Sequence, residues 1–116
     1  MFDFEKLDVY QMVKEQNVKV LMFMRNLNDV DPYLLDQWKR ASLSSLLNLA
    51  EGTGRMTDVD KRHFLTISRG SIFESVAILD LLKSLTLIPE PAYKEFYDKY
   101  EQISKMLLGM FRSYTK

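Results

Sequence analysis

Polar residues form a narrow stripe along an otherwise apolar stretch in the first half of the chain. They recur every three or four positions and fall within about 80° of one another on a helical wheel: Gln37, Arg40, Ser44, Asn48, Glu51 and Arg55. Most other positions between Leu34 and Ala50 are apolar or small. A helix of a small monomeric bundle needs apolar residues on only one stripe. The pattern therefore predicts that this helix packs against a partner outside its own bundle.

Hydrophobic periodicity predicts four helices and no strands. The first should span about residues 4–27, with a packed seam at Tyr10, Val13, Asn17, Val20, Met24 and Leu27. The fourth should span about residues 92–114, with its seam at Phe96, Tyr100, Ile103, Leu107, Met110 and Tyr114. Glycines and prolines cluster at three places, which favours short loops and antiparallel neighbours. We therefore predict an all-α, antiparallel up-and-down four-helix bundle that forms one domain over residues 1–116.

Local signals set the ends of the second helix. Asp31 is suited to cap its N-terminus, and Pro32 to occupy its first position, where a missing N–H has no consequence. Gly52 and Gly54 should close it, with Gly54 as a left-handed C-cap. For the third helix, the spacing of Thr57 and Asp60 resembles a capping box. That helix should continue to about Leu85, before the break at residues 88–91, because residues that precede proline resist helical angles.

The third helix carries two apolar rows about 110° apart on the wheel. One row holds Phe64, Ile67, Ser71, Ile78, Leu82 and Leu85, and we assign it to the bundle core. The other row holds Leu65, Ile72, Val76 and Leu79, and we assign it to an interface with a neighbouring subunit. The alternative is a helix at the centre of its own bundle, with both rows covered inside one chain.

Composition narrows the possible functions. Apolar residues make up 47% and charged residues 28% of the chain, which is typical of a soluble globular protein. The formal net charge is zero, which argues against a strongly basic nucleic-acid binder. The chain has no cysteine, so disulfides and thiolate chemistry are excluded. The first residues lack the layout of an export signal, and no apolar run approaches the ~20 residues of a membrane span. We expect a cytoplasmic protein with no membrane partner.

Catalytic and metal chemistry find little support. His63 is the only histidine, and Asp60 is the only acidic residue at a ligand-like spacing from it, whereas metal sites normally need three or four ligands. Serines are plentiful, but a serine nucleophile needs a base, usually histidine. Serines in helices more often allow two backbones to approach closely. We therefore expect no enzyme activity and no cofactor.

The polar stripe predicts a structural network. In an antiparallel pair with a loop near residues 55–57, Arg40 should lie beside Glu74, and Ser44 beside Ser68 and Gly70. We predict a buried ion pair between Arg40 and Glu74, tied to Gln37, that fixes the register of the two helices. A catalytic role for Glu74 is the alternative, but a carboxylate paired with arginine is held ionised rather than tuned as an acid.

Basic residues gather around the second turn. Arg55, Lys61, Arg62 and Arg69 lie near it, with His63 among them and Arg40 further along the second helix. Repeated around a symmetric oligomer, such a patch could hold a phosphate backbone through summed contacts. The alternative is a solvated helix end with no nucleic-acid ligand.

Several motifs in order resemble one known family. Residues 37–44 (QWKRASLS), 48–55 (NLAEGTGR) and 69–74 (RGSIFE) are similar to patterns of the 23S rRNA intervening-sequence proteins, and residues 4–10 look like the start of that family. Leu49 stands where the family usually has isoleucine, and Ser68 where it usually has alanine. The resemblance covers nearly the whole chain.

The resemblance implies a four-helix bundle that assembles as a ring of five copies. Some members of the family are encoded within insertions in large-subunit ribosomal RNA genes. A related branch comprises the accessory proteins of diversity-generating retroelements, which are basic pentamers that bind nucleic acid and a reverse transcriptase. By this resemblance, nucleic acid would contact Arg40, Arg55, Lys61, Arg62 and Arg69. The neutral charge of this chain favours the alternative, a protein-binding ring with no nucleic-acid affinity.

Overall fold

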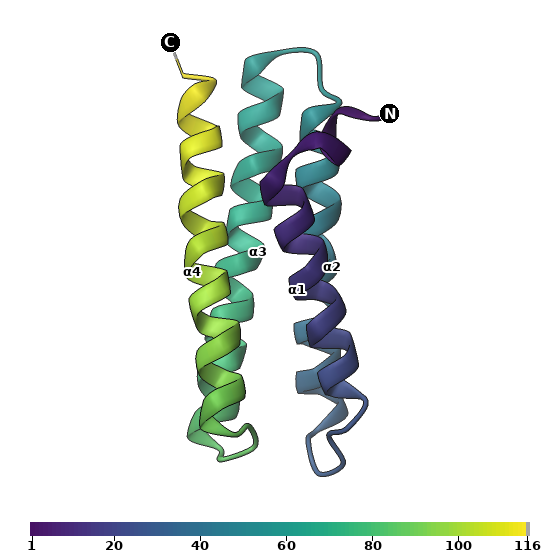
Figure 1. The fold of residues 1–116 in the computed structure, drawn as a ribbon, viewed down its shortest axis with the longest axis vertical. Coiled ribbons are helices and arrows are strands. Elements are labelled where there is room, and N and C mark those ends of the chain that lie inside the picture. The colour runs from purple at the N-terminus through teal and green to yellow at the C-terminus, as the bar shows by residue number, and fades with distance from the viewer. Residues whose placement is uncertain (116) are drawn as a thin grey trace.

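The computed structural model describes residues 1–115, and four α-helices account for most of them (Figure 1). A short 3-10 helix, η1 (Asp3–Lys6), precedes α1 (Asp8–Met24), α2 (Pro32–Thr53), α3 (Asp58–Ser84) and α4 (Glu90–Ser113). The described residues contain no strand. Successive helices run antiparallel, and the bundle measures 46 × 24 × 22 Å. The prediction of an all-α four-helix arrangement is confirmed.

The N-terminal segment differs from the single helix predicted over residues 4–27. Leu7 has an extended backbone with φ −86° and ψ 129°, and it separates η1 from α1. The Leu7 side chain packs against the core from this position. At the other end, α1 stops at Met24, and the amides of Asn26 and Leu27 form tight turn bonds to Phe23 and Met24.

The predicted cap of α2 is present, and of the capping box predicted for α3 the bond to the Thr57 hydroxyl is present. The Asp31 carboxylate accepts a 2.8 Å bond from the amide of Tyr33, and the Thr57 hydroxyl accepts a 3.1 Å bond from the amide of Asp60. Each cap satisfies one of the amides that a helix start leaves without a partner. The prediction of a left-handed C-cap at Gly54 is wrong. Gly54 has φ −87°, and its amide ends α2 through a 3.0 Å bond to the carbonyl of Glu51.

The left-handed residue of the chain lies instead at the end of α3. Thr86 has φ 56°, and the amide of Leu87 reaches back to the carbonyl of Leu82 at 2.9 Å. The amide of Thr86 bonds the carbonyl of Lys83 at 3.0 Å, which completes a Schellman motif. Glycine usually occupies this position, so the sequence carried no signal for the turn.

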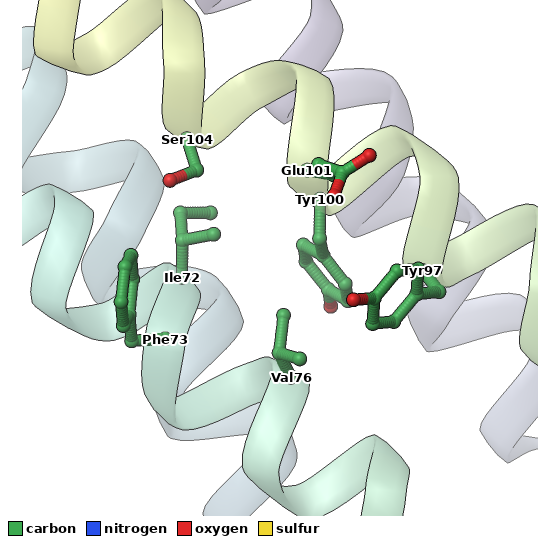
Figure 2. A pocket seen from close by; sticks show the side chains of 7 residues that line it. All are labelled: Ile72, Phe73, Val76, Tyr97, Tyr100, Glu101 and Ser104. Atoms are coloured by element: carbon green, nitrogen blue, oxygen red, sulfur yellow. The ribbon is translucent and has the colours of Figure 1, made fainter.

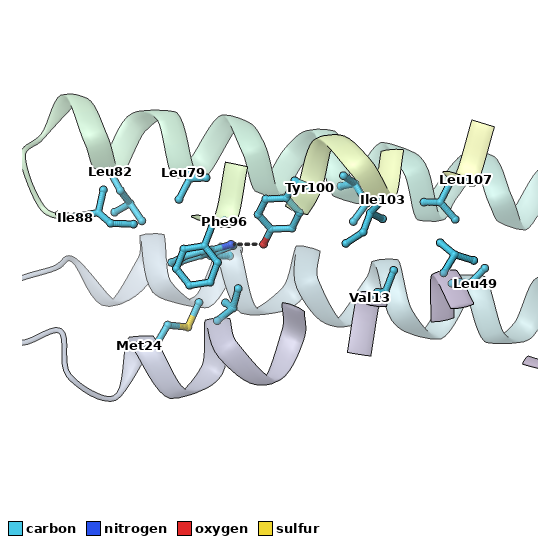
Figure 3. Close-up of a cluster of buried hydrophobic side chains, with 14 of the residues drawn as sticks. Val13, Met24, Leu49, Leu79, Leu82, Ile88, Phe96, Tyr100, Ile103 and Leu107 are labelled. Carbon is cyan, nitrogen blue, oxygen red and sulfur yellow. Dashed lines mark hydrogen bonds between the residues drawn. The ribbon is translucent and has the colours of Figure 1, made fainter. Parts of the chain in front are cut away.

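One apolar core runs along the bundle axis (Figure 3). The predicted seams of α1 and α4 supply much of it, with Val13, Val20, Ile103 and Leu107 fully buried. Trp38 of α2 lies in the middle, where its ring meets Phe23 and Phe96 edge to face. Its indole Nε1–H donates a 3.0 Å hydrogen bond to the hydroxyl of Tyr100, so the one polar atom of the ring is satisfied inside the core.

Small residues line the contact between α2 and α3. Ser68 donates a 2.7 Å bond to the carbonyl of Ser45, and the Ser44 and Ser71 hydroxyls lie 2.8 Å apart. A Cβ atom on Gly52 would lie only 3.0 Å from the Cβ of Phe64. These contacts place the two backbones close together, as expected for serines that serve packing rather than chemistry.

The interface row of α3 was assigned to the wrong partner, and the core row lies only partly in the core. Leu65, Ile72 and Leu79 of the supposed interface row are at most 2% exposed, and all three lie in the core of a single chain. Val76 of the same row is partly buried against that core. In the predicted core row, Ser71 and Leu82 are buried as expected, whereas Ile67 and Leu85 are exposed by 37% and 47%. The correction has a simple cause: α4 covers the second row, and the first row lies on the flank of α3 that adjoins the polar stripe of α2.

Candidate functional site

The polar stripe of α2 and the adjoining flank of α3 form one surface, which we call the α2–α3 face. From α2 it includes the stripe residues Gln37, Arg40, Ser44, Asn48 and Glu51, together with Leu43 and Leu47 beside them. From α3 it includes Ile67, Glu74, Ile78, Leu81 and Leu85. Polar side chains here are half-buried or exposed, and none of them is held in the core.

Hydrogen bonds link the centre of this face. The Asn48 amide donates to the carbonyl and to the hydroxyl of Ser44, at 2.9 and 3.1 Å. Ser44 in turn contacts the hydroxyl of Ser71 on α3. These bonds support the predicted network at Ser44 and Asn48 and set it at the α2–α3 contact.

The charged ends of the predicted network are arranged differently. Arg40 bonds Asp36, one turn earlier on α2, at 2.7 Å, and this contact raises the pKa of the Arg40 guanidinium. Glu51 bonds Arg55 at 2.6 Å, also within α2. The predicted buried pair of Arg40 and Glu74 is therefore wrong for a single chain. Both side chains are exposed, and within residues 1–115 Glu74 has no cationic partner at ion-pair distance. Arg40 and Glu74 lie on the outer flanks of adjacent helices, and no other described part of the single chain covers them. Both charges therefore stay in contact with water.

Several large apolar side chains on the α2–α3 face are exposed to solvent. Leu47 is 54% exposed, and four others are between 37% and 49% exposed, namely Leu43, Ile67, Leu81 and Leu85. Isolated exposed leucines are ordinary on protein surfaces, but a group rimmed by polar residues marks an interaction surface. The register of Ser45 and Ser68 places Leu43, Leu47 and Ile67 at similar heights, with Leu81 and Leu85 further along, near the end of α3. These side chains belong to the part of α2 and α3 that no other helix within residues 1–115 covers.

The predicted basic residues do not form one patch. Arg55, Lys61 and Arg62 share the end of the bundle that holds the α2–α3 loop, whereas Arg40 lies halfway along α2. Lys61 and Arg62 both contact Tyr114, through its ring and its carbonyl, and Arg55 stacks on Phe64 at 4.3 Å. Arg40 pairs with Asp36, so all four of these cations already have a partner within the chain.

Arg69 belongs to a different surface, the groove between α3 and α4. Its guanidinium lies 4.7 Å from the ring centre of Phe73 and donates a 3.2 Å bond to the carbonyl of Ser104. Two open hollows of about 260 and 360 Å³ flank Phe73, and Figure 2 shows Val76 and Tyr97 lining the smaller one. Both hollows are mainly apolar and neither contains a paired acid and base. Sequence reasoning did not identify this groove, because an aromatic residue at a helical position gives no sign of its exposure.

No arrangement for catalysis or metal binding is seen in the described part of the chain. Residues 1–115 contain no group of three or more acidic or histidine side chains that could hold a metal ion. His63 is exposed and packs edge to face on Phe64. Burial raises the pKa of the Tyr100 phenol, an effect that its contacts with Trp38, Ser42 and Ser75 partly offset. Its hydroxyl is bonded to Trp38 inside the core, while the same side chain lines the smaller hollow between α3 and α4.

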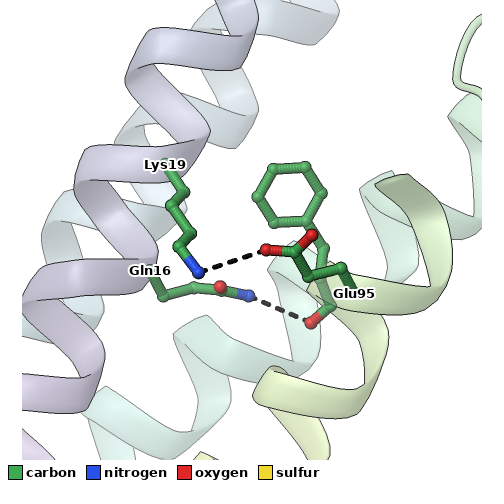
Figure 4. A network of polar contacts seen from close by, with 4 residues as sticks. Gln16, Lys19 and Glu95 are labelled. Carbon is green, nitrogen blue, oxygen red and sulfur yellow. Dashed lines mark hydrogen bonds and ion pairs between the residues drawn. The ribbon is translucent and has the colours of Figure 1, made fainter. Parts of the chain in front are cut away.

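Contacts between α1 and α4 close the opposite side of the bundle. Figure 4 shows Gln16 of α1 donating to the backbone carbonyl of Phe96 at 3.0 Å, and Lys19 bonding Glu95 at 3.1 Å. Gln16 is buried and Lys19 is exposed, so the first bond fixes the helices and the second adds little. This side therefore has a structural role.

The model of the 23S rRNA-intervening sequence protein family matches residues 5–109. The chain belongs to this family. A solved structure of a protein of unknown function from the S23 ribosomal protein family of Bacteroides thetaiotaomicron VPI-5482 has the same fold, with a TM-score of 0.85 and 20% identity. The match covers 89% of this chain and 97% of that one. No curated protein matches the sequence. Within the described residues, every helix is too short or too polar to cross a membrane.

Proposed function

We propose that this family member is a non-enzymatic, cytoplasmic scaffold protein that assembles with copies of itself into a ring. The observation that supports it best is the α2–α3 face, where five leucine and isoleucine side chains of the middle helices stay exposed beside half-buried polar groups. A surface of this kind gains stability when a second macromolecule excludes water from it. Five copies per ring is the number that the family resemblance implies.

The polar groups of the chain support a scaffold rather than an enzyme. The buried phenol of Tyr100 is bonded within the core, and the buried hydroxyls of Ser45, Ser68 and Ser75 donate to backbone carbonyls. Within residues 1–115, none of these three serines bonds a histidine or carboxylate, the general base that a nucleophile requires.

The first test is the mass of the untagged protein in solution. Multi-angle light scattering should give a multiple of the 13.7 kDa chain mass, and a ring of five should give five times that value. A mass equal to one chain at tens of micromolar would rule out the scaffold proposal.

A second candidate function is nucleic-acid binding at the end of the ring. Arg55, Lys61 and Arg62 lie at the same end of the bundle, and a ring with its axis parallel to the helices would repeat them on one rim. Binding of an RNA duplex should then weaken steeply with salt, because each phosphate contact releases counterions.

A matched pair of variants tests this candidate. Lys61→Ala should weaken RNA retention at low salt, whereas Lys94→Ala on α4 should not. If the unmodified protein shows no salt-sensitive retention on RNA, the nucleic-acid candidate is wrong, and a ring that binds only proteins is the remaining function. The engagement of these cations by Tyr114 and Phe64 favours that outcome.

A further inference from the structure

Two opposite charges lie level with each other on the α2–α3 face. The bond between Ser45 and Ser68 fixes the register of the antiparallel helices. Arg40 is five residues before Ser45, and Glu74 is six residues after Ser68. At a rise of about 1.5 Å per residue, these positions differ in height by little more than one residue. By the same register, Leu47 and Ile67 are also level, about two turns away.

Neither charge has a strong partner within the chain. The Arg40 side chain is 72% exposed, and within residues 1–115 it pairs with Asp36 alone, on the same exposed side of α2. A surface pair of this type contributes little to stability. A guanidinium has five N–H donors and can serve a second carboxylate while it keeps the first. Glu74 is exposed, and no cation of the described chain lies at ion-pair distance from it. Both groups are therefore available to a partner.

We propose that the α2–α3 face binds a second copy of this chain, with Arg40 of one copy against Glu74 of the next. The symmetry axis runs parallel to the helices. Rotation about such an axis leaves every residue at its own height, so groups that are level within one copy stay level between copies. With α2 of one copy beside α3 of the next, Arg40 faces Glu74, and Leu47 packs against Ile67.

Charge complementarity identifies the occupant as another copy. The α2 half of the face offers the cation and the α3 half offers the anion at the same height, so the surface complements itself. The half-buried amides of Gln37 and Asn48 lie near the same contact, which gives it the mixed polar and apolar character of a specific interface. This inference rests on the proposed scaffold function and names the surface that performs it.

Charge reversal gives a direct experiment. Arg40→Glu alone, or Glu74→Arg alone, places like charges across every contact. Either variant should raise the dissociation constant of the assembly at least about 10-fold, because like-charge juxtaposition is strongly unfavourable at an interface. Sedimentation velocity measures the dissociation, and circular dichroism should show unchanged helicity because both positions are exposed. Lys94→Glu, on the exposed surface of α4, is the matched control and should leave the assembly intact.

Mixing the two reversed proteins separates contacts between copies from contacts within one. Every contact between an Arg40→Glu copy and a Glu74→Arg copy joins opposite charges, so the equimolar mixture should form mixed pairs and chains while each protein alone stays dissociated. A ring of five cannot alternate two proteins throughout, so the closed ring should return only in the double variant Arg40→Glu/Glu74→Arg, in which every contact joins opposite charges. Full association of Arg40→Glu, or a mixture that stays monomeric, would overturn the proposed surface while the scaffold function stands. A monomeric unmodified protein would overturn both.

Discussion

At the residue scale, the contact between Trp38 and Tyr100 is the most demanding polar feature of the core. Both side chains are at most 2% exposed, and the Trp38 N–H depends on the Tyr100 hydroxyl for its hydrogen bond. Removal of one partner leaves the other buried without its bond, and that loss costs more than the bond itself contributes.

We therefore expect Tyr100→Phe to lower the free energy of unfolding by about 1–3 kcal/mol, since the Trp38 N–H loses its acceptor. Urea denaturation measures the change. Tyr33→Phe is a suitable control, because Tyr33 is 68% exposed and the variant should unfold like the unmodified protein. Equal stability of both variants would show that the buried bond contributes nothing.

The same phenol predicts a pH dependence. Burial raises the pKa of Tyr100 in the folded state, so the unfolded chain ionises first, near the ordinary value of about 10. The stability contributed by the neutral phenol is therefore fully present below about pH 10 and is lost as the pH rises toward the folded-state pKa. The difference in unfolding free energy between the unmodified protein and Tyr100→Phe should shrink between pH 9 and pH 11, by at most about 1.4 kcal/mol per pH unit.

At the element scale, the end of α3 is closed by an unusual residue. Thr86 adopts the left-handed conformation that glycine adopts without strain, and β-branched residues disfavour it. Thr86→Gly should raise the thermal midpoint, because relief of this strain of about 1 kcal/mol exceeds the added freedom of the unfolded chain. Differential scanning calorimetry tests it, and a lowered midpoint would show that the Thr86 side chain stabilises the turn.

Two glycines with different surroundings should respond in opposite ways to substitution by alanine: Gly52 lies at the close contact of α2 and α3, whereas Gly109 lies in open space on α4. Gly52→Ala should cost about 1–2 kcal/mol, because the new methyl group meets Phe64 at 3.0 Å and forces the helices apart. Gly109→Ala, within α4, meets nothing within 4 Å and should stabilise the helix by about 1 kcal/mol. Chemical denaturation of both variants makes the comparison, and a stabilising Gly52→Ala would show that the two helices can separate at little cost.

The sequence predicted the outer helices better than the inner pair. On α1 and α4 a single apolar stripe leaves one possible direction for the core, and Val13, Val20, Ile103 and Leu107 lie where periodicity placed them. On α3, the two apolar rows have similar compositions, so the sequence did not indicate which row is buried by the other helices of the same chain. Ser68 and Ser75, both buried, marked the side that faces α2, because only small residues let backbones come that close.

The candidate surface was partly predictable for a related reason. The stripe on α2 and its height relative to α3 followed from the spacing and the turn, and the bonds of Ser44 to Ser71 and of Ser68 to Ser45 lie within one residue of the predicted register. The exposure of Arg40 and Glu74 did not follow, because side chains on neighbouring flanks can point inward or outward with the same register. That choice depends on the tilt of one helix against another.

At the scale of the whole molecule, substitutions on α3 and α2 should separate unfolding of the chain from dissociation of the assembly, because Leu65, Ile72 and Leu79 lie in the core and not at an interface. Ile72 is 1% exposed within a single chain. Ile72→Asp should therefore cost several kcal/mol and abolish most of the helical signal, since a buried unpaired charge is among the most damaging changes. Leu47→Asp, on the exposed α2–α3 face, should keep its helicity. Circular dichroism of both variants tests this expectation. A folded Ile72→Asp protein would show that this row of α3 is exposed in the single chain.

Trp38 gives this protein a built-in optical reporter. It is the only tryptophan in the sequence, and its ring is shielded from water within one chain. Its fluorescence should shift to longer wavelength when the helices come apart, but should stay constant when intact subunits merely separate. A dilution series followed by emission colour would thus distinguish loss of assembly from loss of fold without any label.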